Sequence, residues 1–144
     1  MDVFKTMDVV GSALTAERTR LNAIASNVAN ANTIKGPNGV YKRQDVVLEA
    51  VPQESQFGEV LSEEEKKLNT EVRVAEVVED QSGGRPVYDP DHPEANAEGY
   101  VYYPNVNPVS EMANMISADR AFQTNVNVFQ TTKQMALKAL EIGR

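Results

Sequence analysis

The stretch "VFKTMDVVGSALTAERTRLNAIASNVANA" (residues 3–31) decides the fold, because its apolar residues follow a helical repeat. Spacings of four and three residues alternate along it, and Glu17 is the single polar member of this seam. The apolar members are Val3, Met7, Val10, Leu14, Leu21, Ile24, Val28 and Ala31. The repeat predicts an amphipathic helix of about four heptads, roughly 45 Å long at 1.5 Å per residue. Gly36, Pro37 and the Asn38-Gly39 pair are expected to end it.

A second helical repeat lies at the other end of the chain. Its seam residues are Met112, Met115, Phe122, Val126, Phe129, Ala136 and Leu140, with Asp119 and Lys133 as polar interruptions. The helix is expected to start near Pro108, with either Asn107 or Ser110 as its cap. Two such seams predict a mainly α fold with a small β segment. In this predicted fold, the long N- and C-terminal helices pack against each other as an antiparallel, coiled-coil-like pair.

The middle of the chain has a different pattern. Runs of β-branched and aromatic residues predict strands at 40–51, 72–78 and 100–103. The charged run at 62–69 is expected to be a solvated loop or a turn of helix. Prolines recur between residues 85 and 108 and favour an extended, ordered crossover, because proline cannot continue a helix.

These patterns divide the chain into three parts of one structural unit. They are an N-terminal core helix (1–34), an acidic β-rich segment with the proline-rich crossover (35–104), and a C-terminal core helix (105–144). Residues 37–104 carry fifteen acidic and six basic side chains, whereas both arms are close to neutral. Clustered cations, which nucleic-acid binding requires, are missing from this pattern.

Composition excludes several classes of site. The chain has no cysteine, which excludes disulfides and thiolate metal sites. No run approaches 18 apolar residues and the start lacks a signal-like segment, so neither a transmembrane segment nor a cleaved signal is expected. The single histidine, His92, lies in "DPDHPE", which lacks the glycine and spacing of a calcium loop. We therefore expect no enzyme, no metal, no cofactor and no small-molecule substrate.

Small apolar residues also lie outside both seams. They are Ala13, Ala16, Ala23, Ala25 and Ala29 in the first arm, and Ala113, Ile116, Ala118, Ala121 and Val128 in the second. Apolar residues around most of a helix indicate contacts on more than one side. We expect copies of the chain or related chains to cover these faces, and a self-contained helical hairpin is the alternative.

Asparagines are unusually placed at the end of the first helix. Asn27, Asn30 and Asn32 lie in its last two predicted turns, although asparagine is a mediocre helix former. Asn27 and Asn125 flank seam positions, where a half-buried amide would fix the register and the partner of a coil. Asn30 and Asn32 could satisfy the last helical carbonyls or a turn. The alternative is that these side chains face solvent and are merely tolerated.

Four stretches carry a family resemblance. "LNAIASNVANANT" (21–33) and "NPVSEMANMISADRAFQTNVNVFQTTKQMALKAL" (107–140) resemble the terminal signatures of flagellar rod, hook and hook-associated proteins. "KGPNGVYKRQDVVLE" (35–49) and "VYDPDHPEANAEGYVYYPNVNPVSEM" (87–112) are similar to stretches of a proximal-rod protein. The chain thus resembles the flagellar axial rod protein family over nearly its whole length. One departure is "TIKGP" (33–37), which replaces the Thr-Pro-Gly-Tyr turn common in other rod proteins.

The resemblance implies a structural subunit of the proximal rod of the flagellar basal body. Such a subunit assembles helically through its terminal helices, transmits torque and forms the wall of the export channel. The implied partners are copies of itself, sister rod proteins, the adaptor protein between rod and MS ring, and the flagellar type III export apparatus. The implied location is the rod in the periplasmic space, reached without signal cleavage. The alternative is a soluble two-helix adaptor or a chaperone-type binding module with stable helices.

Both arms are expected to contribute to the assembly interface, and to be poorly ordered in a dilute monomer because long helices depend on tertiary burial. The expected interface residues are Met7, Val10, Leu14, Leu21, Ile24, Asn27, Val28, Asn30, Met112, Met115, Phe122, Asn125, Val126, Phe129, Ala136 and Leu140.

Overall fold

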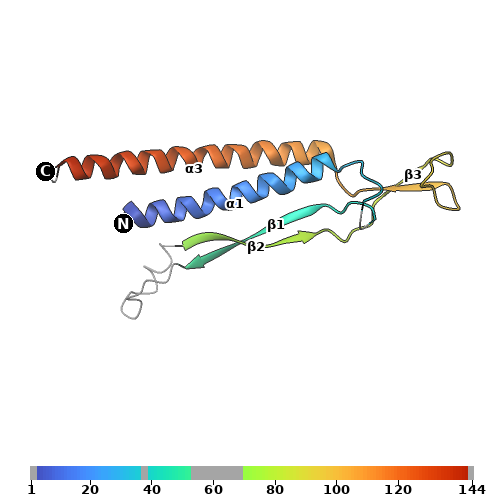
Figure 1. Ribbon diagram of the computed structural model, residues 1–144, viewed down its shortest axis with the longest axis horizontal. Coiled ribbons are helices and arrows are strands. Elements are labelled where there is room, and N and C mark those ends of the chain that lie inside the picture. Colours follow the sequence, from blue (N-terminus) through green and yellow to red (C-terminus); the bar gives the residue numbers. More distant parts are fainter. Residues whose placement is uncertain (1–2, 37–38, 53–69, 143–144) are drawn as a thin grey trace.

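The computed structural model describes residues 3–36, 39–52 and 70–142, so the charged run at 62–69 lies outside the described residues. The elements in chain order are α1 (Val3–Ala29), β1 (Gln44–Pro52), β2 (Thr70–Glu79), β3 (Arg85–Tyr88), β4 (Tyr100–Tyr103) and α3 (Pro108–Ile142). The helices run antiparallel along an elongated molecule, with both termini at one end and the β3–β4 ribbon at the other (Figure 1). The predicted fold class, mainly α with a small β segment, is confirmed.

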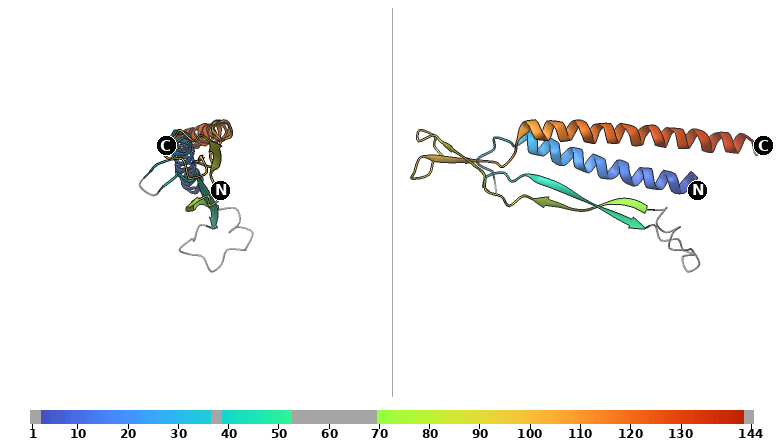
Figure 2. Two further views of the ribbon diagram at one scale, coloured as in Figure 1. Left: turned by 90° about the vertical axis from the view of Figure 1, so that its right-hand side faces the viewer. Right: turned by 180° about the vertical axis from the view of Figure 1, so that it is seen from behind.

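A contact near one end of the helix pair fixes the register of α1 against α3. Asn27 Nδ2 donates a hydrogen bond of 3.1 Å to Glu111 Oε2. Val3 lies 24 residues before Asn27 and Met135 lies 24 residues after Glu111, so these two positions are level along the antiparallel pair. The last seven residues of α3 therefore extend about 10 Å beyond α1 (Figures 1 and 2).

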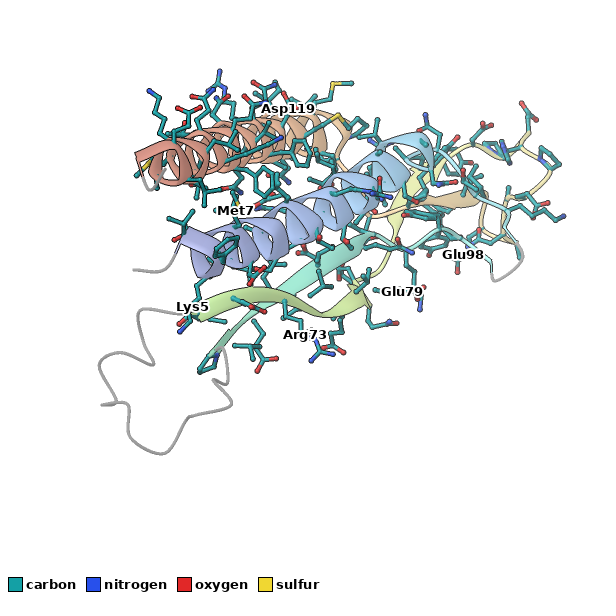
Figure 3. All side chains as sticks on the ribbon, turned by 60° about the vertical axis from the view of Figure 1, so that its left-hand side comes forward. Lys5, Met7, Arg73, Glu79, Glu98 and Asp119 are labelled. Carbon is teal, nitrogen blue, oxygen red and sulfur yellow. The ribbon has the colours of Figure 1, made fainter. Side chains whose placement is uncertain are left out.

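Along α3, the residues that face α1 agree with the predicted seam at every other position. At the positions between, the residue that faces α1 is the one just before the predicted residue. The buried and half-buried residues that keep the alternating spacing are Glu111, Met115, Ala118, Phe122, Asn125, Phe129, Thr132 and Ala136. The prediction used Met112, Asp119, Val126 and Lys133 instead; Val126 is half-buried and the other three are exposed. It was wrong because polar residues occupy part of the true seam. Figure 3 shows Asp119 on the outer side of α3, and Met7 between the two helices.

α1 lies between α3 and the β1–β2 hairpin (Figures 1 and 2). The Ser12 hydroxyl oxygen accepts a hydrogen bond of 3.1 Å from Val72 N on β2. Ala16 and Ala23 follow Ser12 on the same side of the helix, at roughly 100° per residue, and both are buried. The second face of α1 is thus covered by the chain itself. The expectation that other chains must cover the small residues of this helix was wrong for Ala16 and Ala23, whereas Ala25 and Ala29 are exposed and their cover by other chains stays a prediction.

The β strands largely follow the predicted segments, with one addition. β1 pairs antiparallel with β2, and the register shifts between Val47 and Leu48. β1 starts four residues later than residue 40, because Tyr41 and Arg43 are engaged in polar contacts with the helices. β3, predicted only as extended crossover, pairs antiparallel with β4. Proline at position 86 is tolerated there because β3 is an edge strand.

Asparagine side chains form hydrogen bonds at the end of α1 and at the start of α3. α1 ends at Ala29, and the backbone N and Nδ2 of Asn30 donate to Ser26 O at 3.0 and 2.9 Å. Asn30 therefore satisfies a terminal carbonyl, as predicted. Asn107 Oδ1 accepts hydrogen bonds of 3.1 and 3.4 Å from the backbone amides two and three residues later. Of the two predicted caps for α3, the structure selects Asn107 over Ser110.

Candidate assembly interface and buried polar junction

The residues predicted to form the assembly interface fall into two groups. Fourteen are buried or half-buried in the single chain: Met7, Val10, Leu14, Leu21, Ile24, Asn27, Val28, Asn30, Met115, Phe122, Asn125, Val126, Phe129 and Ala136. Met112 and Leu140 are exposed. The burial of the first group comes from the fold of the chain itself, so its part in contacts between chains stays a prediction.

A buried polar junction joins the end of α1 to the starts of β1 and α3. At its centre is Asn27, whose exposed fraction is 0%. Its Nδ2 donates to Gln44 O at 2.8 Å and to Glu111 Oε2 at 3.1 Å. Its Oδ1 accepts from Gln44 N at 2.8 Å and from the Tyr41 hydroxyl at 2.9 Å. A primary amide offers two donors and two acceptor sites, so Asn27 is fully satisfied.

Glu111, in the first turn of α3, is the second member of the junction and is 2% exposed. Arg43 Nε donates to Glu111 Oε1 at 2.9 Å, and Arg43 Nη1 lies 3.2 Å from Asp45 Oδ2. Partial burial opposes the charge on Arg43, but the hydrogen bonds to Glu111 and Asp45 outweigh it and raise the pKa of Arg43 above its usual value. The guanidinium stays charged and compensates the buried carboxylate, which alone would be costly to bury.

Sequence reasoning singled out Asn27 but missed Tyr41, Arg43 and Glu111. Asn27 sets the register of α1 against α3 inside the chain, and an effect on contacts between chains stays a prediction. The available signal for Glu111 was its position, an acidic residue in the first turn after the Asn107 cap. Nothing local connects Glu111 with Arg43, because the two are 68 residues apart.

Glu17 is the polar member of the α1 seam. Its Oε1 lies 3.9 Å from Arg20 Nη1, and its side chain is largely covered. Its Oε2 is buried and receives no hydrogen bond from the residues that the structure describes. A buried oxygen without a donor costs about 1–3 kcal/mol, so Glu17 weakens the helix pair near its middle.

α3 exposes large apolar side chains along its whole length, whereas Phe4 is the only such side chain of α1 within the described residues. Those of α3 are Val109, Met112, Ile116, Val128, Met135, Leu137 and Leu140. They are spread around the sides of the helix that α1 leaves open, except Leu140, which lies in line with Ala136 but beyond the end of α1. We call this exposed surface the outer face of α3. Ile116 is 56% exposed and lies two residues before buried Ala118, which is roughly 200° around the helix. Val109, Met112 and Ile116 are neighbours on one side of the helix, and a contiguous group of exposed apolar side chains is typical of an interaction site.

The lone histidine lies in a turn. His92 Nδ1 accepts a hydrogen bond of 3.1 Å from Glu94 N. Within the described ranges, no cluster of three or more histidine, cysteine or acidic side chains is arranged to hold a metal ion. Neither α1 nor α3, over its described length, is apolar enough to cross a membrane.

Known proteins match this chain from end to end. The family "Flagella basal body rod protein" matches residues 7–34, and "Flagellar basal body rod FlgEFG protein C-terminal" matches residues 97–142. "Flagellar basal-body rod protein FlgC" of Escherichia coli O6:H1 is 42% identical to this chain over 147 residues, and the alignment covers both proteins completely. The FlgC protein of Bacillus subtilis (strain 168) is 39% identical over 152 residues, again with complete coverage of both. That of Aquifex aeolicus is 36% identical, over 98% of this chain and 97% of the relative.

The chain belongs to the FlgC family of flagellar basal-body rod proteins. Membership indicates a structural role in the rod of the flagellar basal body. Asn27 lies inside the first matched segment, and Glu111 lies inside the second with the whole outer face of α3. Arg43 lies between the two segments. The junction therefore connects the two parts of the chain by which the rod family is identified.

Proposed function

We propose that the chain is a structural subunit of the proximal rod that assembles helically through its terminal helices. In the assembled rod these helices form the wall of the export channel, and their packing transmits torque. The observation that best supports the proposal is the outer face of α3, whose apolar side chains have no cover within the described chain.

The partners in this proposal are further copies of the chain and sister rod proteins, which would share the contacts along α3. The adaptor between the rod and the MS ring contacts the assembled subunit. The export apparatus delivers the chain to the periplasmic space without cleavage of a signal. Covering one large apolar side chain contributes about 1.5–3 kcal/mol, and a standard interface of about 800 Å² per partner would cover several of those on α3.

The test is an aspartate on the outer face of α3. Ile116→Asp should remove the chain from basal bodies and abolish swimming when it is the sole copy in its host, because a charge would have to be buried at the contact. Its urea midpoint should stay unchanged, since the isoleucine is already exposed. Basal bodies are isolated and probed for the chain, and swimming is scored on soft agar.

Ser117→Asp is the matched control, because Ser117 is exposed on the same turn and carries no apolar group. It should assemble and swim normally. Leu21→Asp and Phe122→Asp are less informative, because both residues are half-buried in the single chain and a charge there would disturb folding. Normal incorporation of Ile116→Asp into basal bodies would contradict the proposal.

A further inference from the structure

The β3–β4 ribbon has one covered face and one aromatic face. Side chains alternate along paired strands, and Val87 opposite Val101 marks the covered face, where Val101 is completely buried. The other face carries Pro86, Tyr88, Tyr100 and Tyr102, all of them exposed. Tyr88 is the most exposed of the tyrosines, at 65%. An exposed row of tyrosines is unusual for a solvated surface and typical of the centre of a protein interface.

The aromatic face is held in a fixed shape before any partner binds. The rings of Tyr88 and Tyr100 meet edge to face, with centroids 5.3 Å apart. Gly99 has a φ of +81°, and a Cβ there would lie 3.0 Å from Tyr88 Cε2, so the ring packs directly on the backbone. Within the described residues, the hydroxyls of Tyr88, Tyr100 and Tyr102 make no hydrogen bond. They remain available to a partner.

The turn that joins β3 to β4 adds negative charge beside the aromatic face. It carries Asp89, Asp91, Glu94 and Glu98. Glu94 is paired with Lys35 at 2.7 Å, whereas no described cation forms an ion pair with the other three. The surface therefore suits a partner that combines exposed apolar side chains with lysine or arginine.

A surface of that chemistry exists at the opposite end of the molecule. The part of α3 that extends past α1 exposes Leu137 and Leu140 on one side of the helix, Leu140 at 70%, and Met135 is exposed on the opposite side just before it. Lys133 is exposed between Leu137 and Leu140, and Lys138 is exposed on the side of Met135. Figures 1 and 2 place this helix end and the β3–β4 ribbon at opposite ends of the long axis. One molecule cannot bring them together, because α3 alone is about 50 Å long.

We infer that the aromatic face of the β3–β4 ribbon binds the C-terminal end of the last helix of a neighbouring rod subunit. That helix end has the chemistry seen here in residues 133–140. The inference rests on the proposed function, because it supplies one of the contacts by which subunits assemble. It joins unlike ends of successive molecules, and a repeated head-to-tail contact produces an open helical assembly.

Site-specific photo-cross-linking in assembled rods tests this contact. The full chain carries p-benzoylphenylalanine in place of Tyr102 and is the sole copy in its host. The matched control carries it in place of Tyr103, the adjacent, half-buried residue whose ring lies 5.8 Å from the Arg85 guanidinium carbon. Basal bodies are isolated and irradiated, and the cross-linked peptides are identified by mass spectrometry.

We expect position 102 to cross-link to the last turns of the C-terminal helix of a rod subunit, and position 103 to give little product. Cross-links from position 102 to a ring protein, to peptidoglycan or to a β hairpin would overturn the inference. So would the absence of any product from chains recovered in basal bodies. If the unsubstituted chain itself is missing from basal bodies, the proposed function fails instead.

A double variant provides a second measurement. Tyr88→Ser with Tyr102→Ser removes the aromatic surface. Loss of the contacts of Tyr88 with Tyr100 and Gly99 should lower the thermal midpoint slightly, whereas the helicity should be unchanged because both residues lie in the ribbon. Loss of swimming with a folded chain supports the contact, and unchanged swimming contradicts it.

Discussion

At the residue scale, Asn27 carries the largest share of the specific contacts. Its four hydrogen bonds reach both the backbone of Gln44 and the side chain of Glu111. These contacts fix where β1 leaves the end of α1 and where α3 begins. A hydrophobic residue at this position would leave the Gln44 backbone groups and a Glu111 oxygen buried without partners, which explains a polar residue in the helix pair.

Asn27→Ala should therefore destabilise the chain by about 2–4 kcal/mol, because it leaves several buried polar groups unsatisfied. The free energy of unfolding from urea denaturation measures this loss. Asn32→Ala is the control, since Asn32 is exposed just after α1, and it should change stability by about 0.5 kcal/mol or less. Equal stability of the two variants would show that Asn27 has no such structural role.

At the scale of elements, the two helices differ in how many sides are covered. α1 packs on α3 with one face and on the β1–β2 hairpin with another, and Ala16 is 2% exposed on the hairpin side. Small side chains there let the hairpin backbone approach the helix, as the bond from Val72 N to Ser12 shows. α3 packs on α1 along one side only, so most of its remaining surface is uncovered within the described chain.

Ala16→Leu should destabilise the chain by about 1–3 kcal/mol, because three extra carbon atoms must fit between α1 and the hairpin. Ala25→Leu adds the same atoms at an exposed position of α1 and should have little effect. The comparison uses the urea midpoints of the two variants. If Ala16→Leu were as stable as Ala25→Leu, the hairpin would not be packed against this face in solution.

At the scale of the whole molecule, the covered and uncovered regions lie at different places along the long axis. The middle of α1 has neighbours on two sides, whereas residues 136–142 of α3 extend beyond α1. The sequence led us to expect that both arms are poorly ordered in a dilute monomer. Because the middle of α1 is covered, we now expect poor order mainly at the end of α3. Its order should depend most on a neighbouring subunit, because an isolated short stretch of helix is marginal in water.

Within the two helices, amide exchange in the dilute monomer should be slowest in α1 around residues 16–24 and fastest in residues 136–142 of α3. Hydrogen exchange followed by mass spectrometry measures both regions in one experiment. Assembly into the rod should slow exchange in residues 136–142 far more than in α1. Slow exchange of 136–142 in the monomer would mean that this helix end needs no partner.

The sequence predicted the elements of this fold well and their contacts less well. Helical repeats are local, so both helices and their antiparallel pairing could be predicted, and so could Asn30 as the closing residue of α1. The register of α3 could not, because Glu111 and Thr132 occupy seam positions where an apolar side chain is expected, and Met112 beside them is apolar but exposed. In a single sequence, an apolar residue indicates a buried position even where it lies on the outer surface.

The amino-acid sequence by itself determined two long amphipathic helices at the ends of an acidic, β-containing middle, since periodicity and composition act over short distances along the chain. Its terminal motifs also pointed to the flagellar rod. Only the tertiary structure decided which faces are covered. It placed the hairpin on α1, joined Asn27 and Arg43 to Glu111, and left the outer face of α3 free. These are contacts between residues far apart in the chain, and their energies depend on burial and hydrogen bonding that exist only once the segments have come together.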